Sequence, residues 1–376
     1  MHEKRITSLQ ELVPHLQKMQ ARKIDTVVPS SLVKFDTGQL VIDGVEPVLT
    51  ADGVTDANGL YMPTDLAVGQ LANFVNVPVR YARRLLDERP DLFDANFNGW
   101  LNGSGFAPDE RNLLYRFYAA SDEGPAVLRS VHSQHYKSFD YLDSVHAVLS
   151  GLSQAGLTGG DLKITGSLSE KHMRLYVEAP EITANISDAL VGYRDPTSGA
   201  QVGDVIRAGL SFSNSEVGQG AVRTCPYVVV LRCTNGWVQE QDAMRSIHAG
   251  TKLEEGIVDW SARTQQKNLE LIESQIADAV GTFLSVGYVE EVAEWFNTQS
   301  HKEVEKPEEV IQMVSTELQY SEATRAGIMS MFIKGGQITA LGVGQAMTAL
   351  ANQVEHPDLA HSLRADAFKA VELASA

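Results

Sequence analysis

The chain has 376 residues, of which 43% are hydrophobic and 21% charged, a composition typical of a globular protein and not of a disordered one. Its length predicts two or three domains or subdomains. No apolar run approaches the roughly 20 residues that a membrane helix needs, and the first 19 residues are polar and amphipathic where a secretory signal would be apolar. We therefore expect a cytoplasmic protein that does not contact a membrane.

The formal net charge is −17, which at first argues against a nucleic-acid partner. The acidity is uneven, with a net charge of −3 over residues 1–120, −4 over 121–250 and −10 over 251–376. A polyanion responds to the charge of the local face and not to the total charge, so the first two thirds of the chain can still form a basic face that binds nucleic acid. The two cysteines, Cys225 and Cys233, are too few for a disulfide framework or a four-cysteine zinc site, and we expect small core residues.

Residues 1–20 are predicted to form a helix, followed by a hairpin in which strands 31–35 and 39–43 flank the turn signal "DTG". Two helices follow. Residues 62–77 carry an apolar stripe that Thr64 or Asp65 can cap, and residues 78–90 begin and end at a proline. The second helix is basic, with Arg80, Arg83, Arg84 and Arg89. Such a run is either a solvated helix face or part of a binding groove.

Residues 111–250 predict a β-rich middle region. Strand-like patterns cover 112–119 and 125–139, and 140–156 read as a helix with Asp140 near its N-cap. Four further strands are predicted within 161–180, 205–214 and 222–233, separated by polar turns such as "SLSEK" and "NSEVGQG". Consecutive strands joined by short turns indicate an antiparallel sheet.

Alternation along these four strands separates an apolar face from a cationic one, because side chains in a strand point to opposite faces with period two. The residues expected on the apolar face include Leu162, Ile164, Met173, Leu175, Val177, Ile206, Ala208, Leu210, Phe212, Cys225, Tyr227, Val229, Leu231 and Cys233. The residues expected opposite them include Lys163, Arg174, Arg207 and Arg232, with Val228 and Val230. The second face is either a half-solvated sheet with scattered long side chains or a surface that binds a polyanion.

Residues 251–376 are predicted to be helical throughout, with acidic exposed faces and with Gly342 and Gly344 placed for close helix packing. The expected fold is α+β, a central antiparallel sheet with flanking helices followed by an all-helical C-terminal region. The expected domains are an N-terminal hairpin plus helical pair (1–110), a β-rich core (111–250) and the acidic helical region (251–376).

Common catalytic and cofactor signatures are absent from the sequence: it has no phosphate-binding loop, no dinucleotide fingerprint after a strand, no H-E-x-x-H and no G-x-S-x-G. We therefore expect no cofactor. His132 and His135 are three apart, which puts them on opposite faces of a strand, so we expect no metal there. An enzyme that pairs His248 with one of the cysteines as base and nucleophile stays an alternative.

Four short motifs carry a resemblance to a known family. They are "VHSQHY", "NSEVG", "CTN" and the histidine of "IHAGT". With them the chain resembles the phage/plasmid-like protein family, a family of unknown function found on phages, prophages and plasmids, although the first motif contains an extra histidine. The matching residues are Ser133, Tyr136, Asn214, Ser215, Gly218, Cys233, Asn235 and His248. The resemblance implies a mobile-element protein that works near replicating or recombining DNA, and it transfers no catalytic mechanism.

The leading hypothesis is a phage-encoded protein that binds single-stranded DNA and promotes annealing or recombination. Phosphates would be contacted by Lys163, Arg174, Arg207, Arg223 and Arg232, and bases would stack on Tyr136, Tyr176 and Trp237. Arg80, Arg83 and Arg84 would extend the groove, and the chain would form a homo-oligomer. One alternative is a non-enzymatic modulator of a host protein, which the acidic C-terminal helices would contact. The other is an enzyme that uses Cys233, His248 and Glu216.

Overall fold

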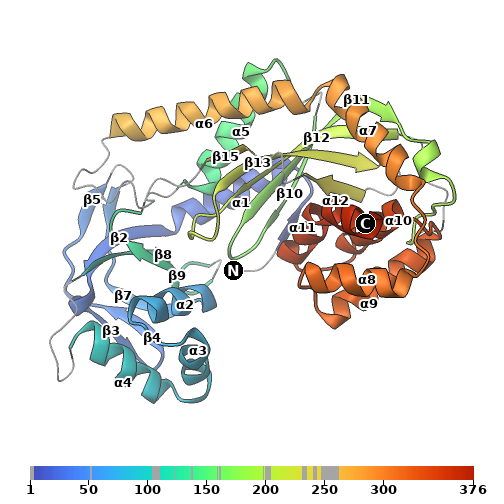
Figure 1. Cartoon of the computed structure of the whole chain (residues 1–376). Coiled ribbons are helices and arrows are strands. Elements are labelled where there is room, and N and C mark those ends of the chain that lie inside the picture. Colours follow the sequence, from blue (N-terminus) through green and yellow to red (C-terminus); the bar gives the residue numbers. More distant parts are fainter. Residues whose placement is uncertain are drawn as a thin grey trace.

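The computed structural model describes residues 4–50, 53–103, 111–122, 124–136, 139–158, 160, 162–197, 199, 205–230, 235–239, 244–246 and 262–376. Two sheets and a bundle of C-terminal helices make up these parts, as Figure 1 shows. The fold is α+β, as the sequence predicts, with an antiparallel sheet at its centre and a helical C-terminal region. Among the described helices, none combines the length and the apolar character that a membrane crossing requires.

A six-stranded sheet forms the N-terminal lobe, in the order β2-β8-β9-β7-β4-β3. Its strands are β2 (Lys23–Pro29), β3 (Val33–Asp36), β4 (Gln39–Ile42), β7 (Gly59–Pro63), β8 (Asn112–Tyr118) and β9 (Val127–Ser133), with a 3-10 turn at Ser30–Leu32. The predicted hairpin is confirmed as β3–β4. Its two-residue turn places Thr37 and Gly38 at φ of 54° and 77°, the left-handed backbone that a tight hairpin requires. A separate pair, β5 (Val48–Thr50) and β6 (Gly53–Thr55), lies at the edge of this lobe.

Three helices cover one face of this sheet: α2 (Asp65–Phe74), α3 (Val79–Glu88) and α4 (Pro90–Leu101). Thr64 caps α2 as predicted, since its hydroxyl accepts the Ala67 amide at 3.1 Å. Pro90 occupies the first position of α4 in addition to following α3. The aromatic rings of Phe35, Phe93 and Phe97 pack together beneath these helices.

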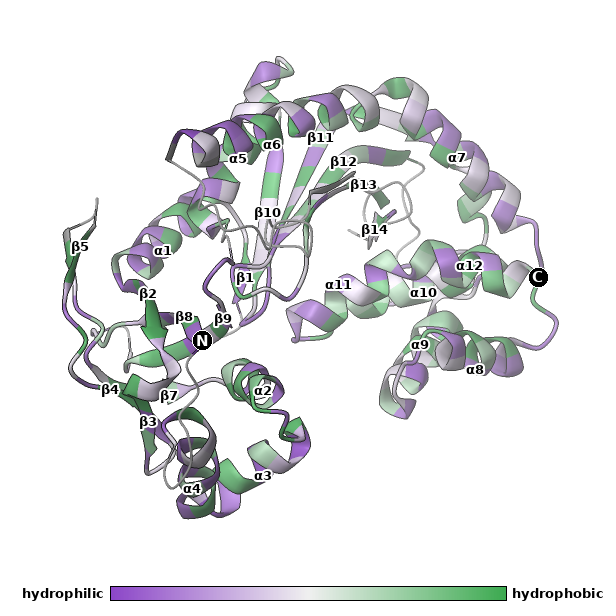
Figure 2. Ribbon diagram, turned by 60° about the vertical axis from the view of Figure 1, so that its left-hand side comes forward, coloured by the Kyte–Doolittle hydropathy of each residue, from purple (hydrophilic) through white to green (hydrophobic). Residues whose placement is uncertain are grey.

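The central sheet is antiparallel and seven-stranded, in the order β1-β10-β11-β12-β13-β14, with β15 also paired to β13. Its strands are β1 (Lys4–Ile6), β10 (Lys163–Leu168), β11 (Met173–Asn185), β12 (Val205–Asn214), β13 (Val222–Val230), β14 (Asn235–Val238) and β15 (Met244–Ser246). The helices that pack with its apolar face include α1 (Leu9–Ala21), α5 (Tyr141–Gln154), α6 (Ala262–Phe283) and α7 (Val286–Ser300). Figure 2 shows α5, α6 and α7 arching over the strands.

Five shorter helices complete the C-terminal region: α8 (Pro307–Glu317), α9 (Glu322–Gly335), α10 (Ala340–Ala351), α11 (Pro357–Ala365) and α12 (Ala367–Ser375). They share a core of their own and meet the central sheet at β14. The close packing predicted at Gly344 is confirmed. A Cβ there would lie 2.4 Å from Cη2 of Trp237 and 2.6 Å from Cγ2 of Val371, so only glycine fits.

Two sequence predictions about organisation are wrong. Strands β8 and β9 pair with β2 and β7, so they belong to the N-terminal sheet and not to the β-rich middle region. Conversely, β1 pairs with β10 of the central sheet, and α1 packs against the same core. Residues 4–21 therefore belong with the central sheet, because strand pairing follows spatial proximity and not chain order.

Candidate nucleic-acid interface

One row of residues crosses the polar face of the central sheet and contains several arginines. Ser167 of β10 pairs with Arg174 of β11, which pairs with Ser213 of β12, which pairs with Arg223 of β13. Arg5 of β1 lies opposite Ser167, and the backbone of Arg245 lies opposite Arg223. Directly opposed residues share a face of an antiparallel sheet, so the register places Arg5, Arg174 and Arg223 on one side. Arg5 and Arg245 were not predicted from the sequence, because strand register has no local sequence signal.

Arg174 is the best-anchored member of this row. Its side chain is buried, and its Nη1 donates to Oδ1 of Asp358, at the start of α11, at 2.5 Å. The Nδ1 of His172 lies 3.3 Å from the same oxygen, and the Ser169 hydroxyl donates to it at 3.2 Å. Partial burial raises the pKa of Asp358, but the hydrogen bonds from His172 and Arg174 outweigh it and hold this pKa well below its usual value. Asp358 therefore takes the place that a phosphate would need at Arg174.

The predicted stacking role of Tyr176 is wrong in this structure. Its ring is 5% exposed, because α11 covers it. The hydroxyl lies 3.1 Å from Nδ1 of His361, and the guanidinium carbon of Arg364 lies 5.3 Å from the ring centre. Tyr176 holds α11 against the sheet instead of offering a face to a base.

Cys225, Tyr227 and Val229 lie on the polar side of β13, opposite to the prediction. They form a small apolar cluster with Tyr176 and Val238, whereas Val228 and Val230 face the main core. Both faces of β13 are buried here, so apolar residues occupy both of its alternating positions. The sequence therefore does not indicate which face packs against the larger core.

Two other predicted cations lie apart from the arginine row. Lys163 pairs with Glu178 across the strands at 3.0 Å. Arg207 is six residues from Ser213 along β12, roughly 20 Å at the rise of an extended strand. Its Nε is buried and has no hydrogen-bond partner among the residues that the structure describes. The predicted cations therefore share a face but do not cluster. Arg232, Cys233 and His248 lie outside the described residues.

Trp237 is fully buried and lies on the apolar side of the sheet, so the prediction that it stacks on bases is wrong in this structure. Its ring meets Phe296 at 4.8 Å and Phe368 at 5.2 Å between ring centres, both edge to face. These contacts come from α7 and α12, and Gly344 of α10 closes the third side. The residue joins the C-terminal helices to the central sheet.

Several of the family-motif residues meet at a joint between the two sheets. The Nδ2 of Asn214 donates to the carbonyl of Phe139 and to the hydroxyl of Ser144, both at 2.6 Å. Ser215 Oγ accepts the amide of Gln219 at 2.9 Å. Gly218, at φ of 74°, packs against His132, whose ring stacks on Tyr136 at 3.9 Å.

Tyr136 is thus already stacked within the protein, and burial raises its pKa to about 12. Ser133 accepts the Tyr136 amide at 3.0 Å and closes the turn after β9. Asn235 pairs with Val230, at the end of β13 remote from Arg223. Val230 is eight residues from Val222, roughly 26 Å along β13, so its partner Asn235 takes no part in the joint.

A buried network of charges fills the joint. Arg116 is fully buried and donates to Asp25 at 2.7 Å, to Asp140 at 2.8 Å and to the carbonyl of Glu216 at 2.5 Å. Asp140 also pairs with Lys23. Burial alone would raise the pKa of Asp140, but the charges of Arg116 and Lys23 have the larger effect and lower it to about 2. Asp140, the predicted N-cap residue of α5, therefore uses its carboxylate in ion pairs, and the carboxylate accepts no hydrogen bond from a helix amide.

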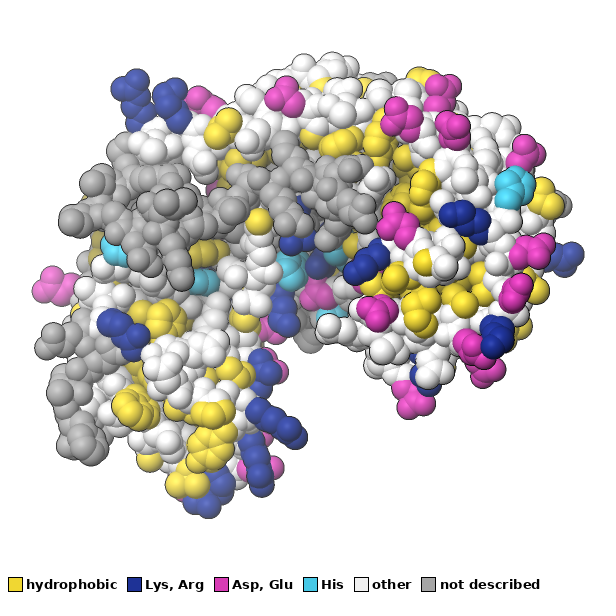
Figure 3. Space-filling view, viewed as in Figure 1, with side chains coloured by type: hydrophobic (Ala, Val, Ile, Leu, Met, Phe, Trp, Pro, Cys, Tyr) yellow, Lys and Arg dark blue, Asp and Glu magenta, His cyan; other side chains and the backbone are white. Residues whose placement is uncertain are grey.

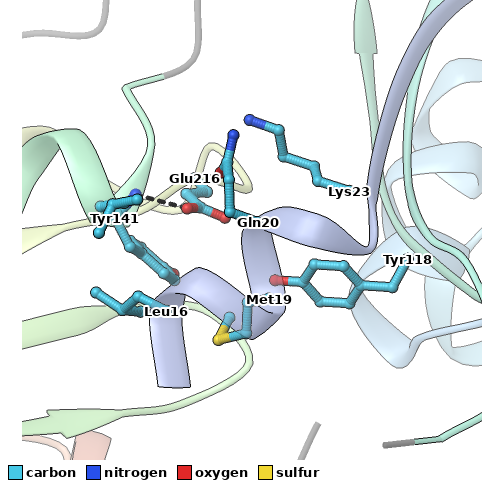
Figure 4. A pocket seen from close by; sticks show the side chains of 8 residues that line it. Leu16, Met19, Gln20, Lys23, Tyr118, Tyr141 and Glu216 are labelled. Atoms are coloured by element: carbon cyan, nitrogen blue, oxygen red, sulfur yellow. Dashed lines mark hydrogen bonds between the residues drawn. The ribbon is translucent and has the colours of Figure 1, made fainter. Parts of the chain in front are cut away.

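Glu216 completes the network from the central sheet. Its carboxylate pairs with Arg129, whose guanidinium stacks on Tyr118 at 4.1 Å, and it accepts the amide of Tyr141 at 2.6 Å. Figure 4 shows the small cavity beside it, of about 10 Å³, which is room for one water. A side chain so enclosed and paired has no access to substrate, and this counts against its role in the alternative Cys–His enzyme.

A basic surface lies on α3 instead of on the sheet. Arg80, Arg83 and Arg84 are exposed, and Tyr81 between them is 48% exposed. Arg83 donates to the carbonyl of Asp65 at 3.2 Å and Arg84 pairs with Glu88 at 2.9 Å, while Arg80 has no partner among the described residues. Figure 3 shows a notch between the N-terminal lobe and the C-terminal helices, with Lys and Arg side chains along the edge of that lobe.

The neighbouring helix α2, and not α3 itself, contacts the loop at one end of the central sheet. Gln70 of α2 donates to the carbonyl of Val217 at 3.0 Å, in the loop between β12 and β13. The Nε2 of His172 lies 3.0 Å from the carbonyl of Gln219 in the same loop. Lys171, beside His172, is exposed. This loop thus connects the N-terminal lobe to the end of the sheet where Lys171 and Arg223 lie.

Groups of three or more histidine, cysteine or acidic residues able to hold a metal ion do not occur among the residues that the structure describes. His132 and His135 have separate contacts. His132 contacts Ser130 Oγ at 3.0 Å, and His135 contacts its neighbour Gln134 at 3.2 Å.

Comparison with known proteins identifies no relative: no family model, no curated protein and no solved structure matches the chain. The resemblance to the phage/plasmid-like family therefore stays a prediction.

Proposed function

We propose that this protein binds single-stranded DNA in the notch beside α3, as a phage-encoded protein of DNA metabolism that promotes strand annealing or recombination. The observation that carries the proposal is the surface of α3, where three exposed arginines and a half-exposed tyrosine lie within two turns of the same helix. Cations that follow a phosphate backbone and an aromatic ring on which bases stack are the two components of sequence-independent single-strand binding.

The rest of the protein is acidic, and this restricts where DNA binds. Charges further apart than the Debye length, about 8 Å at physiological salt, are largely screened from each other. Helices α8–α12, which carry part of the negative charge of residues 251–376, lie on the other side of the notch from α3 (Figures 1 and 3). A strand would therefore be attracted to α3 and repelled from the C-terminal helices, which orients it along the N-terminal lobe.

The polar face of the central sheet has a smaller role in this proposal than the sequence suggests. Arg174 is neutralised by Asp358, and Tyr176 is covered by α11. Lys171 and Arg223 lie at the end of the strands that adjoins the N-terminal lobe, and in this proposal they supply further cations beyond those of α3. We place the phosphate contacts of the strand on Arg80, Arg83 and Arg84 first and on this end of the sheet second.

Fluorescence anisotropy with a labelled single strand of about 30 nucleotides, at two salt concentrations and beside the matching duplex, tests the proposal. The wild-type protein should prefer the single strand, with affinity that falls steeply as salt rises. Arg80→Glu/Arg84→Glu should weaken binding and reduce the slope of log affinity against log salt by about 1.4, since each lost contact to a single strand removes about 0.7.

The matched control is Lys334→Glu/Lys369→Glu, which makes the same change of charge on exposed positions of α9 and α12. If affinity depends only on total charge, both double variants lose it equally and the α3 site is wrong. An absence of binding by the wild type at low salt would contradict the whole proposal.

A further inference from the structure

The turn between β10 and β11 carries a histidine that contacts two separate segments of the chain. The Nδ1 of His172 lies 3.3 Å from Oδ1 of Asp358, in the first turn of α11. Its Nε2 lies 3.0 Å from the carbonyl oxygen of Gln219, in the loop between β12 and β13. One imidazole ring thus joins the C-terminal helices to a loop of the central sheet.

Both atoms that face this ring are hydrogen-bond acceptors. An ionised carboxylate and a backbone carbonyl offer lone pairs and no proton. A neutral imidazole has a single N–H and donates to only one of them, whereas an imidazolium has two N–H groups and donates to both. The geometry around His172 therefore fits the doubly protonated ring. In the neutral ring, one bare nitrogen would face an oxygen lone pair.

The carboxylate partner keeps its charge across the pH range in which imidazoles titrate. Partial burial raises the pKa of Asp358, but the hydrogen bonds from His172 and Arg174 outweigh it and hold this pKa well below its usual value. The guanidinium of Arg174 is charged throughout. A change in this contact between about pH 5 and pH 8 therefore arises from the histidine and not from its partners.

Other charged or titratable groups belong to the elements that meet at the ring. They are Glu170 and Lys171 in the same turn, His356 just before α11, Glu216 in the β12–β13 loop and Arg223 on β13. Glu216 is engaged by Arg129, and the Nδ1 of His356 accepts the amide of Asp358 at 3.2 Å. The side chain of His172 is 21% exposed, so water can supply and remove its proton.

The two segments that His172 joins are attached to different parts of the molecule. The loop of Gln219 is bound to the N-terminal lobe, because Gln70 of α2 donates to the carbonyl of Val217. Asp358 begins α11, which packs into the core of the C-terminal helices. Figure 3 shows histidines and charged side chains of both signs at the inner end of the notch between these two parts. A contact that depends on one proton therefore connects the two sides of the notch.

We propose that His172 is a pH-sensitive link between the C-terminal helices and the N-terminal lobe. At about pH 5–6, the acidic end of the range in which imidazoles titrate, the ring donates to Asp358 and Gln219 together and holds α11 against the β12–β13 loop. As the pH rises toward 8, the ring loses one proton to water and one of the two bonds is lost. The inference does not depend on DNA binding, because its test uses the protein without DNA.

Urea denaturation of the wild type and of His172→Gln, at pH 6 and at pH 8, tests the proposal. Glutamine keeps a polar side chain in the turn but does not titrate. Relative to the wild type, the variant should lose about thirtyfold in the ratio of folded to unfolded protein at pH 6, where a charge-assisted bond is removed. The loss should fall to about fivefold at pH 8, where only a neutral bond is removed.

His146→Gln is the matched control, since His146 is exposed on α5 and away from this contact. Its stability relative to the wild type should show no comparable change between the two pH values. Circular dichroism before denaturation confirms that both variants are folded. An equal loss in His172→Gln at pH 6 and pH 8, or the same change with pH in both variants, would overturn the proposal.

Nuclear magnetic resonance of the full chain labelled with nitrogen-15 in its histidines observes the ring directly. The signals of His172 are identified by their absence from the spectrum of His172→Gln or of His172→Asn, whichever is folded. In the wild type they should show two protonated nitrogens at pH 6 and one at pH 8. A ring that stays neutral at pH 6, or that stays doubly protonated at pH 8, would contradict a pH-sensitive link.

Discussion

Arg174 and Asp358 lie 184 positions apart in the chain and are joined by a hydrogen-bonded ion pair of 2.5 Å. This contact connects the centre of the antiparallel sheet to the first turn of α11 and neutralises one of the five cations predicted to contact phosphates. His172 and Ser169 bind the same carboxylate oxygen. The C-terminal region is therefore part of the sheet's polar face and not a separate appendage.

Asp358→Asn should destabilise the protein by about 2–3 kcal/mol, at the lower end of the range for broken buried pairs because Asp358 keeps some solvent contact. The cost arises because Arg174 stays buried without a counter-charge. Urea denaturation followed by circular dichroism measures it. The double variant Arg174→Met/Asp358→Leu should recover part of the loss, since it removes both charges together. A double variant as unstable as the sum of the single changes would show that the pair is not coupled.

Tyr81→Ala should weaken single-strand binding by about tenfold, the loss expected when one base loses an aromatic platform. The dependence on salt should stay the same, because no charge is removed. Fluorescence anisotropy at two salt concentrations measures both quantities. Trp100→Ala is the matched control, since Trp100 is an aromatic residue of the same lobe, 59% exposed on α4. Equal effects of the two substitutions would argue against stacking on α3.

Acid should destabilise the joint between the sheets through Asp140. Its pKa of about 2 in the folded protein lies below the value of about 3.9 for an unfolded aspartate. The stability that it contributes is therefore complete above about pH 4 and is lost as the pH falls toward 2. Asp140→Asn should be less stable than wild type at pH 7, by about 3 kcal/mol, and the difference should shrink below pH 4. A difference that is constant from pH 7 to pH 3, measured by urea denaturation, would contradict this role.

Gly344→Ala should destabilise the protein by about 1–3 kcal/mol, the usual cost of overpacking a core. The added methyl group would meet the Trp237 ring and Val371, and neither can retreat because both are buried. Gly281→Ala in α6 is the matched control, since nothing lies within 4 Å of its Cβ position and alanine favours a helix there by about 0.5–1 kcal/mol. Thermal unfolding of both variants gives the comparison; a tolerated Gly344→Ala would mean that α10 can shift away from the sheet.

The sequence by itself determined the local elements of this protein. The β3–β4 hairpin, the Thr64 cap of α2, strands β10 to β13 of the central sheet and the helical C-terminal region all follow from patterns within 5 to 20 residues. Such patterns are readable because side-chain period, capping and turn geometry depend on neighbours in the chain. Arg80, Arg83 and Arg84 are visible for the same reason, since one exposed helix face is a local property.

Only the tertiary structure decided which strands pair, in which register, and what covers each face. Strand pairing moved β8 and β9 into the N-terminal sheet, and register put Arg174 and Arg223 in one row while leaving Arg207 far along β12. The packing of α11 then buried Tyr176. These outcomes depend on contacts between residues up to 349 positions apart, such as that of Arg5 with Val354. A strand's sequence is compatible with several partners, and the free energy that selects one comes from the packing of the whole chain.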